Sequence, residues 1–234
     1  MLPMLSAKNL NACYGQAHIL SDLNLEAAEG EVVVLLGRNG AGKSTTLKAL
    51  IGLVPPSGGE VMFRGERIDG LQPFQIAQRG LGYVPEDRRI FTELTVRENL
   101  EVGRQPARQG LPSWTVERLF KLFPNLAETG DRPAAQMSGG EQQMLTIART
   151  LMGNPACVLL DEPSEGLAPV IVDQMAAAVL EMKSEGLSVL ISEQNLHFAM
   201  DVADRAYIIE QGRIRFSGAM SDLNAEVRGA YLAV

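Results

Sequence analysis

A glycine-rich segment in the first fifth of the chain has the residue types that bind phosphate. It reads Gly, four residues, then Gly-Lys-Ser, and it comprises Gly37, Arg38, Asn39, Gly40, Ala41, Gly42, Lys43, Ser44 and Thr45. Glycines let successive backbone amides turn toward phosphate oxygens, and a following helix adds the positive end of its dipole. We expect Lys43 to reach the β- and γ-phosphates of a nucleotide, and the Ser44 hydroxyl to bind Mg²⁺.

Two adjacent carboxylates, Asp161 and Glu162, end a short apolar run that begins at Cys157. A strand buried in a parallel sheet would place such carboxylates beside the phosphate loop. Asp161 would then hold Mg²⁺, usually through water, and Glu162 would polarise the attacking water. Without the phosphate loop, the same pair would suit the solvated end of a strand equally well.

A second anion-binding pattern occurs at Ser138, Gly139, Gly140 and Glu141, just before an apolar helical run over 144–152. A hydroxyl, free amides and a helix dipole at one helix start favour an anion. Because one ATP has a single triphosphate, which the first loop holds, this second site makes sense if it serves the ATP of a partner chain. On its own, Ser-Gly-Gly is more often a turn.

The elements that must position these residues alternate between strands and helices. This alternation predicts an α/β fold: a P-loop NTPase core with a mostly parallel sheet, an antiparallel β edge subdomain, and an inserted helical subdomain. We expect a single domain, 1–234, with the ATP-binding core in 1–86 and 155–234 and the helical subdomain in 87–154. The expected strands are 5–10, 24–27, 31–36, 59–63, 157–161, 188–192, 206–210 and 213–217, and the expected helices outside the insertion are 43–53, 170–184 and 196–203.

Composition narrows the function further. A net charge of −7 and a pI near 5.0 argue against a protein whose main task is to grip nucleic acid. No run approaches 18 apolar residues, so we expect no membrane span, and the first ten residues lack the pattern of a secretory signal. Cys13 and Cys157 have no metal or redox spacing, and we expect two reduced thiols in the cytosol.

The phosphate loop, the Ser138-Gly139-Gly140 segment and the Asp161-Glu162 pair, in this order and spacing, resemble an ABC ATPase over nearly the whole chain. The resemblance implies ATP and Mg²⁺ as ligands. It implies that Tyr14 stacks on adenine and that 164–168 crosses a dimer interface. Glu86 stands where the family usually has a glutamine that contacts Mg²⁺ and the γ-phosphate. Gln194 stands where it usually has a histidine that contacts the γ-phosphate, and the resemblance implies a catalytic role for Gln194 together with Glu162.

Within that family, segments 84–91, 94–100, 164–169 and 192–195 resemble importers of branched-chain amino acids, in which Glu86 and Gln194 are usual in one of two ATPase subunits. This resemblance implies a second ATPase subunit, two transmembrane permease subunits, a separate substrate-binding protein, and a peripheral place on the cytoplasmic face of the cell membrane. A heterodimer is favoured and a homodimer stays open. We expect the segment from Glu86 to Glu101 to pass motion to the membrane subunits. No nucleic-acid partner is expected.

Several alternatives stay open at this point. Urea or short amides could replace the amino acid, because the ATPase never touches the substrate. Glu86 and Gln194 also fit a non-hydrolysing regulatory subunit. His197 could replace the family histidine, although a surface helix histidine is the simpler interpretation, and Trp114 could be core or a permease contact. A soluble ABC ATPase acting on DNA or ribosomes, or a small-molecule kinase, fits less of the pattern.

Overall fold

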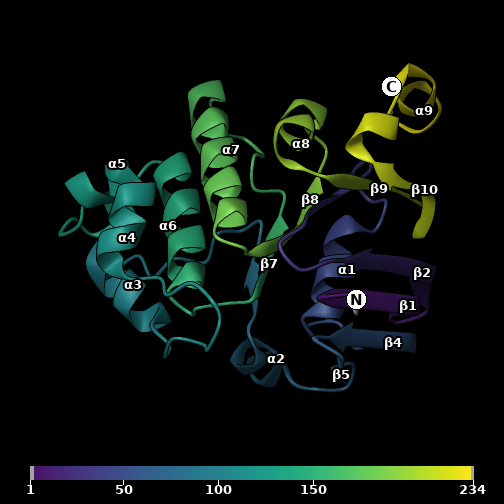
Figure 1. The fold of residues 1–234 in the computed structure, drawn as a ribbon, viewed down its shortest axis with the longest axis horizontal. Coiled ribbons are helices and arrows are strands. Elements are labelled where there is room, and N and C mark those ends of the chain that lie inside the picture. Colours follow the sequence, from purple (N-terminus) through teal and green to yellow (C-terminus); the bar gives the residue numbers. More distant parts are fainter. Residues whose placement is uncertain (1–2, 233–234) are drawn as a thin grey trace.

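The chain folds into two β-sheets with helices around them, as Figure 1 shows. The fold is taken from a computed structural model, which describes residues 3–232. The four-stranded sheet has the order β2-β1-β4-β5 and is antiparallel. Its strands are β1 (Leu5–Tyr14), β2 (Ala17–Ala27), β4 (Gly58–Phe63) and β5 (Glu66–Arg67).

The six-stranded sheet has the order β10-β9-β3-β8-β7-β6, with only the edge strand β10 antiparallel to its neighbour. Its strands are β3 (Val32–Leu36), β6 (Leu81–Val84), β7 (Cys157–Asp161), β8 (Ser188–Glu193), β9 (Arg205–Glu210) and β10 (Arg213–Ala219). The predicted fold class is therefore confirmed.

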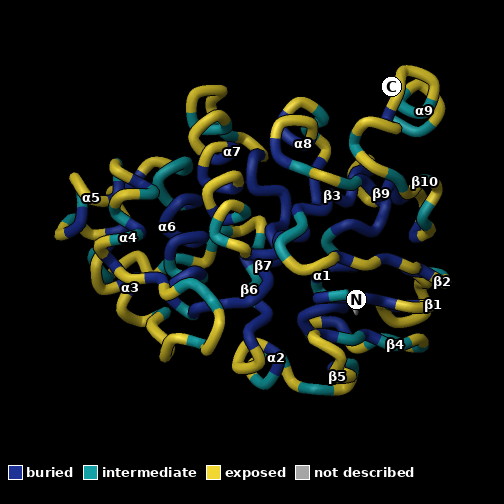
Figure 2. Tube along the Cα trace, viewed as in Figure 1, coloured by how far each residue is buried: buried dark blue, intermediate teal, exposed yellow. Residues whose placement is uncertain are grey.

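Strand β3 lies inside the sheet, between β8 and β9, and is covered on both faces. All five of its residues are buried, and they alternate between two hydrophobic cores (Figure 2). Val32, Val34 and Leu36 pack into the core that includes α6, α7 and α8, whereas Val33 and Leu35 pack into the core shared with α1 and the antiparallel sheet. A strand covered on both faces reads as a continuous apolar run. The loop that follows it is thereby fixed at one end.

The helices fall into two groups. Those that follow strands of the two sheets are α1 (Lys43–Leu50), α2 (Pro73–Arg79), α7 (Pro169–Ser184), α8 (Leu196–Val202) and α9 (Ala225–Tyr231), with the short η2 (Met220–Asp222). A second group, shown in teal and green on one side of Figure 1, comprises α3 (Val96–Gly103), α4 (Val116–Leu122), α5 (Pro124–Glu128), η1 (Ala134–Gln136) and α6 (Gly139–Leu151). All of the second group lies within 87–154, the range in which a helical subdomain is expected.

Some boundaries differ from the prediction for identifiable reasons. Helix α1 ends at Leu50, before the predicted residue 53, because Gly52 adopts φ +78° and closes the helix. Helix α6 begins at Gly139 and not at Met144, because Ser138 caps it. Strand β6 and helix α2 were not predicted, since the strand has only four residues. Both ends of β7 match the predicted range.

Candidate functional site

The phosphate loop connects the end of β3 to the start of α1. Gly40 and Gly42 have φ +78° and +112°, values that favour glycine. Gly37 has no room for a side chain, because a Cβ there would lie 2.5 Å from the carbonyl oxygen of Ile209. The turn between β9 and β10 holds the loop from the other side, as the Gly212 N–H donates to the Ala41 carbonyl at 2.8 Å. The loop is therefore set by its packing.

A cavity of about 420 Å³ opens in front of this loop. It brings together most of the predicted nucleotide residues with two that were not predicted, Ile19 and Glu165. The lining residues are Ile19, Asn39, Gly40, Gly42, Lys43, Ser44, Thr45, Glu86, Glu162 and Glu165. The phosphate loop and the side chains of Glu162 and Glu165, which lie more than a hundred residues apart in sequence, thus face the same cavity.

Lys43 is buried at the base of this cavity with only 3% of its surface exposed. Its Nζ donates to the carbonyls of Gly37 (2.8 Å) and Arg38 (3.2 Å) and lies 3.0 Å from Glu162 Oε1. A buried ammonium needs such a complete set of oxygen partners. The phosphate-loop lysine and the carboxylate after β7 are therefore in direct contact.

Glu162 is held on its other side by Gln194. The Gln194 Nε2 donates to Glu162 Oε2 at 2.8 Å, so the two residues predicted to be catalytic touch each other. Glu162 has φ +46°, and its N–H donates to the Ser192 carbonyl at 3.0 Å. A left-handed, buried glutamate is costly and persists where surrounding contacts enforce it. Its carboxylate is thus fixed between an ammonium and an amide.

Asp161 is almost fully buried, and two neighbouring strands supply its partners. Ser192 Oγ donates to Oδ1 at 2.6 Å, and the Tyr83 hydroxyl donates to Oδ2 at 3.0 Å. Burial, and then the charge of Asp161, raise the pKa of Tyr83, so the phenol keeps its proton and donates. The sequence analysis did not assign Tyr83 or Ser192 a role. Their signal is a polar residue near the carboxyl end of a strand that flanks β7.

Glu193 is a third supporting residue that was not predicted. It is 2% exposed, and its carboxylate accepts from three backbone amides: Ser164 (3.0 Å), Gln194 (2.9 Å) and Asn195 (3.0 Å). A buried carboxylate is stable when several N–H groups point at it. Glu193 thereby ties the segment after β7 to the segment after β8 and fixes the backbone of Gln194.

Negative charge gathers around the cavity. Burial raises the pKa of Glu165 first, and the charges of Glu162 and Glu86 raise it further. Glu86 itself is exposed at the rim. The three glutamates of the lining oppose a single lysine, so the cavity surface favours a ligand that brings cationic charge with its phosphates.

The Ser138 segment lies at the start of α6 and lines no part of this cavity. Glu141 Oε2 accepts from the Ser138 N–H at 2.7 Å, and Glu141 N–H donates to Ser138 Oγ at 3.4 Å. Gly140 is pressed against α7, because a Cβ there would lie 2.9 Å from Ile171 Cγ2. The capped start of α6 therefore lies outside the cavity at the phosphate loop.

Tyr14 also lies outside the lining. It ends β1, pairs with Ala17 on β2 and is 50% exposed. His197 is exposed on α8, where its Nδ1 contacts Asp201 at 3.0 Å, and it is absent from the lining. Trp114 is buried in the core beside the helical group, which favours the core interpretation. In the described chain both cysteines are free thiols, and burial raises the pKa of Cys157 to about 12.

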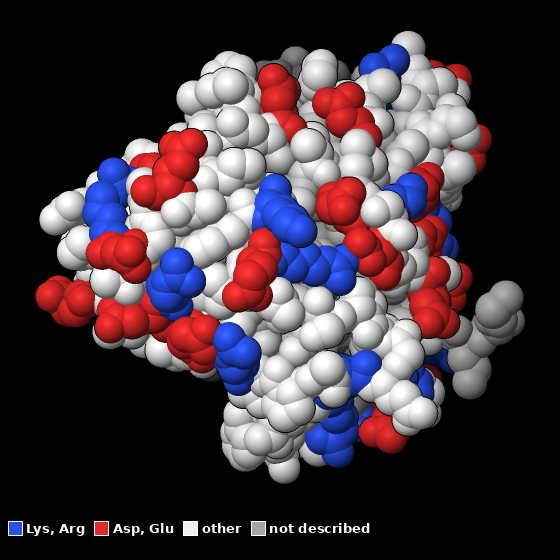
Figure 3. Space-filling view, turned by 60° about the vertical axis from the view of Figure 1, so that its left-hand side comes forward, with Lys and Arg blue, Asp and Glu red and all other residues white. Residues whose placement is uncertain are grey.

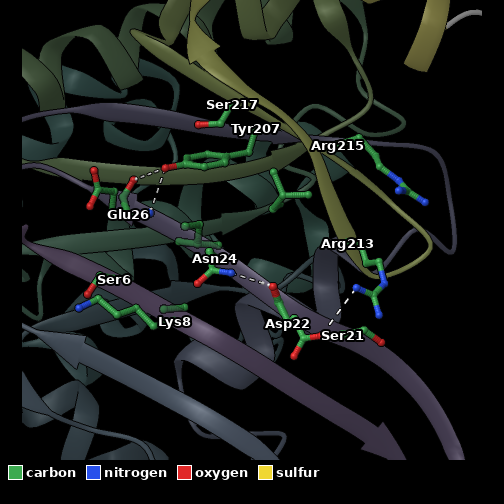
Figure 4. Close-up of a pocket in the computed structure, with 13 residues that line it drawn as sticks. Ser6, Lys8, Ser21, Asp22, Asn24, Glu26, Tyr207, Arg213, Arg215 and Ser217 are labelled. Carbon is green, nitrogen blue, oxygen red and sulfur yellow. Dashed lines mark hydrogen bonds and ion pairs between the residues drawn. The ribbon is translucent and has the colours of Figure 1, made fainter.

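A second pocket, of about 680 Å³, lies between β2 and β10 and differs from the cavity at the phosphate loop (Figure 4). Its polar groups pair with one another: Arg213 with Asp22 at 3.7 Å, and the Tyr207 hydroxyl with the Glu26 N–H at 3.1 Å. No predicted site residue lines it. The candidate site is therefore the smaller cavity at the phosphate loop.

Comparison with known proteins agrees with this geometry. The family model described as ABC transporter matches residues 20–165, which is more than half of the chain. This chain belongs to the ABC transporter family. As an ABC ATPase it binds ATP and hydrolyses it, and the predicted recognition is confirmed.

Three relatives give the range of likeness. The high-affinity branched-chain amino acid transport ATP-binding protein BraG of Pseudomonas aeruginosa is 42% identical over 98% of this chain and 99% of its own length. The lipopolysaccharide export system ATP-binding protein LptB of Haemophilus influenzae is 36% identical over 99% and 98%. A crystal structure of the ADP conformation of an ATP-binding cassette superposes with a TM-score of 0.83 at 26% identity, covering 100% of both chains.

Two further observations concern the helices and the surface. Within residues 3–232, no helix has the length and apolar character needed to cross a bilayer. Acidic and basic side chains are interspersed over the face drawn in Figure 3.

Proposed function

We propose that this chain is the motor subunit of an importer for branched-chain, hydrophobic amino acids. The observation that carries the proposal is the 42% identity to BraG over nearly the full length of both chains. The contact between Lys43 and Glu162 in a cavity lined by the phosphate loop supports active ATP chemistry in this chain. The lower identity to LptB gives no comparable reason to propose export.

Mg²⁺ fits the cavity as the partner of ATP. The surplus of glutamates over lysine would repel a bare triphosphate, and a divalent cation would offset that repulsion. We assign the metal to Ser44, Asp161 and Glu86. The described residues contain no cluster of three or more His, Cys, Asp or Glu that would hold a metal alone. Such a donor set suits an ion that completes its shell with phosphate oxygens and water.

ATP would bind along the phosphate loop, with its adenine toward Tyr14. The amides of the loop, from Gly37 to Thr45, would surround the phosphates. A γ-phosphate would compete with Glu162 for Lys43. Glu162 would then be held by Gln194 and could accept the proton of the attacking water. Positioning and charge stabilisation would supply most of the catalysis.

The capped start of α6 would serve the ATP of a partner ATPase subunit. In this assignment Ser138, Gly139, Gly140 and Glu141 bind or shape the site for the partner's γ-phosphate. Segment 87–154 would act as the helical subdomain that moves relative to the core formed by 1–86 and 155–234. The partner would be a second ATPase subunit of the same transporter, with a heterodimer favoured and a homodimer as the alternative.

A groove of about 630 Å³ would receive the permease subunits. It lies between the core and the helical group, and apolar side chains predominate at its surface. Four of its residues are exposed large hydrophobics: Leu53, Phe74, Phe91 and Val102. We assign this groove to a helical segment of a permease, because an exposed apolar groove suits an amphipathic helix. The chain would thereby lie on the cytoplasmic face of the cell membrane, in a transporter that also uses a separate substrate-binding protein.

The test is reconstitution with the permease subunits and the substrate-binding protein in vesicles. We expect leucine uptake to require ATP and the wild-type chain, and Glu162→Gln to abolish both uptake and ATP hydrolysis. Removing a catalytic carboxylate of this kind costs on the order of a hundredfold or more in rate. Uptake of urea or short amides in place of leucine would mean that the transporter imports one of these compounds and not a branched-chain amino acid. Equal, negligible turnover of wild type and Glu162→Gln would instead favour the non-hydrolysing regulatory subunit.

A further inference from the structure

Arg88 lies at the start of helix α6, where a cation is electrostatically misplaced. A Cβ built on Gly139 would lie 2.6 Å from Arg88 Nη1 and 3.4 Å from its Cζ, so the guanidinium covers this glycine. The amino end of a helix carries partial positive charge from amides without helical partners. A guanidinium placed there is repelled unless an anion joins it.

No acidic side chain of the described residues neutralises this charge. Within 3–232, the half-buried guanidinium of Arg88 takes part in neither an ion pair nor a hydrogen bond. The neighbouring Arg89 contrasts with it, because its Nε lies 2.8 Å from Asp87 Oδ2. The acid in the first turn of α6, Glu141, is already bound to Arg132 and to the Ser138 N–H. The donors of Arg88 are therefore available to a ligand.

The backbone around Arg88 is fastened to α6, which keeps the side chain in this place. Arg88 and Arg89 are consecutive left-handed residues, with φ +63° and +47°. The Arg88 carbonyl accepts from Thr146 Oγ1 at 2.7 Å, and the Arg89 carbonyl accepts from Arg149 Nη2 at 2.6 Å. Two consecutive left-handed side-chain-bearing residues persist only where such contacts enforce them.

We propose that Arg88 is a phosphate-binding residue that acts in trans. Its guanidinium, together with the amides at the start of α6, would contact the γ-phosphate of the ATP held by the partner ATPase subunit. This inference rests on the proposed dimer. The charges agree with it, because a second copy's cavity has three glutamates and one lysine in its lining and would gain an extra cation. Arginine suits phosphate because its planar donors bind two oxygens at once.

The experiment measures dimer formation in the Glu162→Gln background, which would slow hydrolysis so that ATP stays bound. Light scattering would give the dimer dissociation constant with Mg-ATP for Arg88→Gln, Arg88→Lys and the matched control Arg89→Gln. A fluorescent ATP analogue would give the nucleotide affinity of the monomer in dilute solution. The control replaces the adjacent arginine, which has the same left-handed backbone but an internal partner.

We expect Arg88→Gln to raise the dimer dissociation constant roughly a hundredfold, because a homodimer loses two charge-assisted contacts worth about tenfold each. Arg88→Lys should fall between wild type and Arg88→Gln, and Arg89→Gln should stay within about twofold of wild type. Monomer affinity for nucleotide should not change, since Arg88 would act on the other subunit's ATP. A purely structural role would instead lower thermal stability and monomer affinity together.

Two outcomes overturn the inference, and they differ. If the Glu162→Gln chain forms its Mg-ATP dimer and Arg88→Gln leaves the dissociation constant unchanged, Arg88 has no role in trans and the proposed function stands. The second outcome is that the chain forms no Mg-ATP-dependent dimer, either with a second copy or with a second ATPase subunit of the transporter. The proposed dimer is then wrong. The inference and the mechanism proposed for the motor then fall together.

Discussion

At the scale of single residues, the site depends on carboxylates that are each held by named partners. Lys43 and Gln194 hold Glu162, whereas Ser192 and Tyr83 hold Asp161. A buried carboxylate that loses a donor keeps its desolvation cost without compensation. Replacing Tyr83 or Ser192 should therefore lower stability, even though neither residue lines the cavity at the phosphate loop.

Tyr83→Phe tests this support. We expect the free energy of unfolding to fall by about 1.5–3 kcal/mol, because the lost hydrogen bond ends on a buried carboxylate. Tyr207→Phe is the matched control: its hydroxyl contacts the backbone of Glu26, and we expect a smaller loss of about 0.5–1.5 kcal/mol. Urea unfolding of both variants decides between these values. If both variants lose the same free energy of unfolding, the hydrogen bond from Tyr83 to Asp161 stabilises the chain no more than an ordinary hydrogen bond.

At the scale of elements, sequence patterns predicted what is local and missed what joins distant segments. The buried strands β3 and β7 and the cap at Ser138 follow from apolar runs and capping residues. The contact of Tyr83 with Asp161, and of Glu193 with Ser164, depends on which strands are neighbours in the sheet. No local periodicity encodes that adjacency, so these supporting residues could not be found beforehand.

The cap of α6 gives a prediction in pH. Burial raises the pKa of Glu141, but the hydrogen bonds from Ser138 and the charge of Arg132 lower it more, so the net pKa lies below the ordinary value of a glutamate. A carboxyl whose pKa is lower in the folded chain stabilises it above the unfolded pKa. That contribution is lost as the pH falls through the folded pKa.

Glu141→Gln should therefore lower the stability of the chain at pH 7 and flatten its loss of stability below pH 4.5. Urea unfolding at pH 7, 4.5 and 3.5 measures both effects. Glu98→Gln is the companion variant, because the Thr95 backbone N–H lowers the pKa of Glu98 in the capping box of α3. If the stability of wild type and Glu141→Gln changes with pH in the same way across this range, the Glu141 carboxylate does not contribute to the pH dependence of stability.

At the scale of the whole molecule, the structure separates three surfaces. The cavity at the phosphate loop is one, the capped start of α6, proposed above as a second anion site, is another, and the apolar groove between core and helical group is the third. Arg149 links the last two: it belongs to α6, lines the groove, stacks on Phe91 and donates a hydrogen bond to the Arg89 carbonyl. A permease segment bound in the groove would thus contact, through Arg149, the helix whose start is capped by Ser138.

Phe74→Asp tests the groove without touching the nucleotide cavity. Phe74 is 63% exposed, so a charge there should change the stability of the isolated chain by no more than about 0.5 kcal/mol, and its ATPase rate should not change. In the apolar groove, however, a bound permease segment would desolvate the aspartate, and assembly with the permease subunits should weaken roughly tenfold or more. Met200→Asp, on α8 and 53% exposed, is the matched control, because it introduces the same charge outside the groove. Co-purification and uptake in vesicles measure the result. If both variants assemble equally well, the permease contact lies elsewhere; if only Phe74→Asp fails, the groove connects the motor to the membrane.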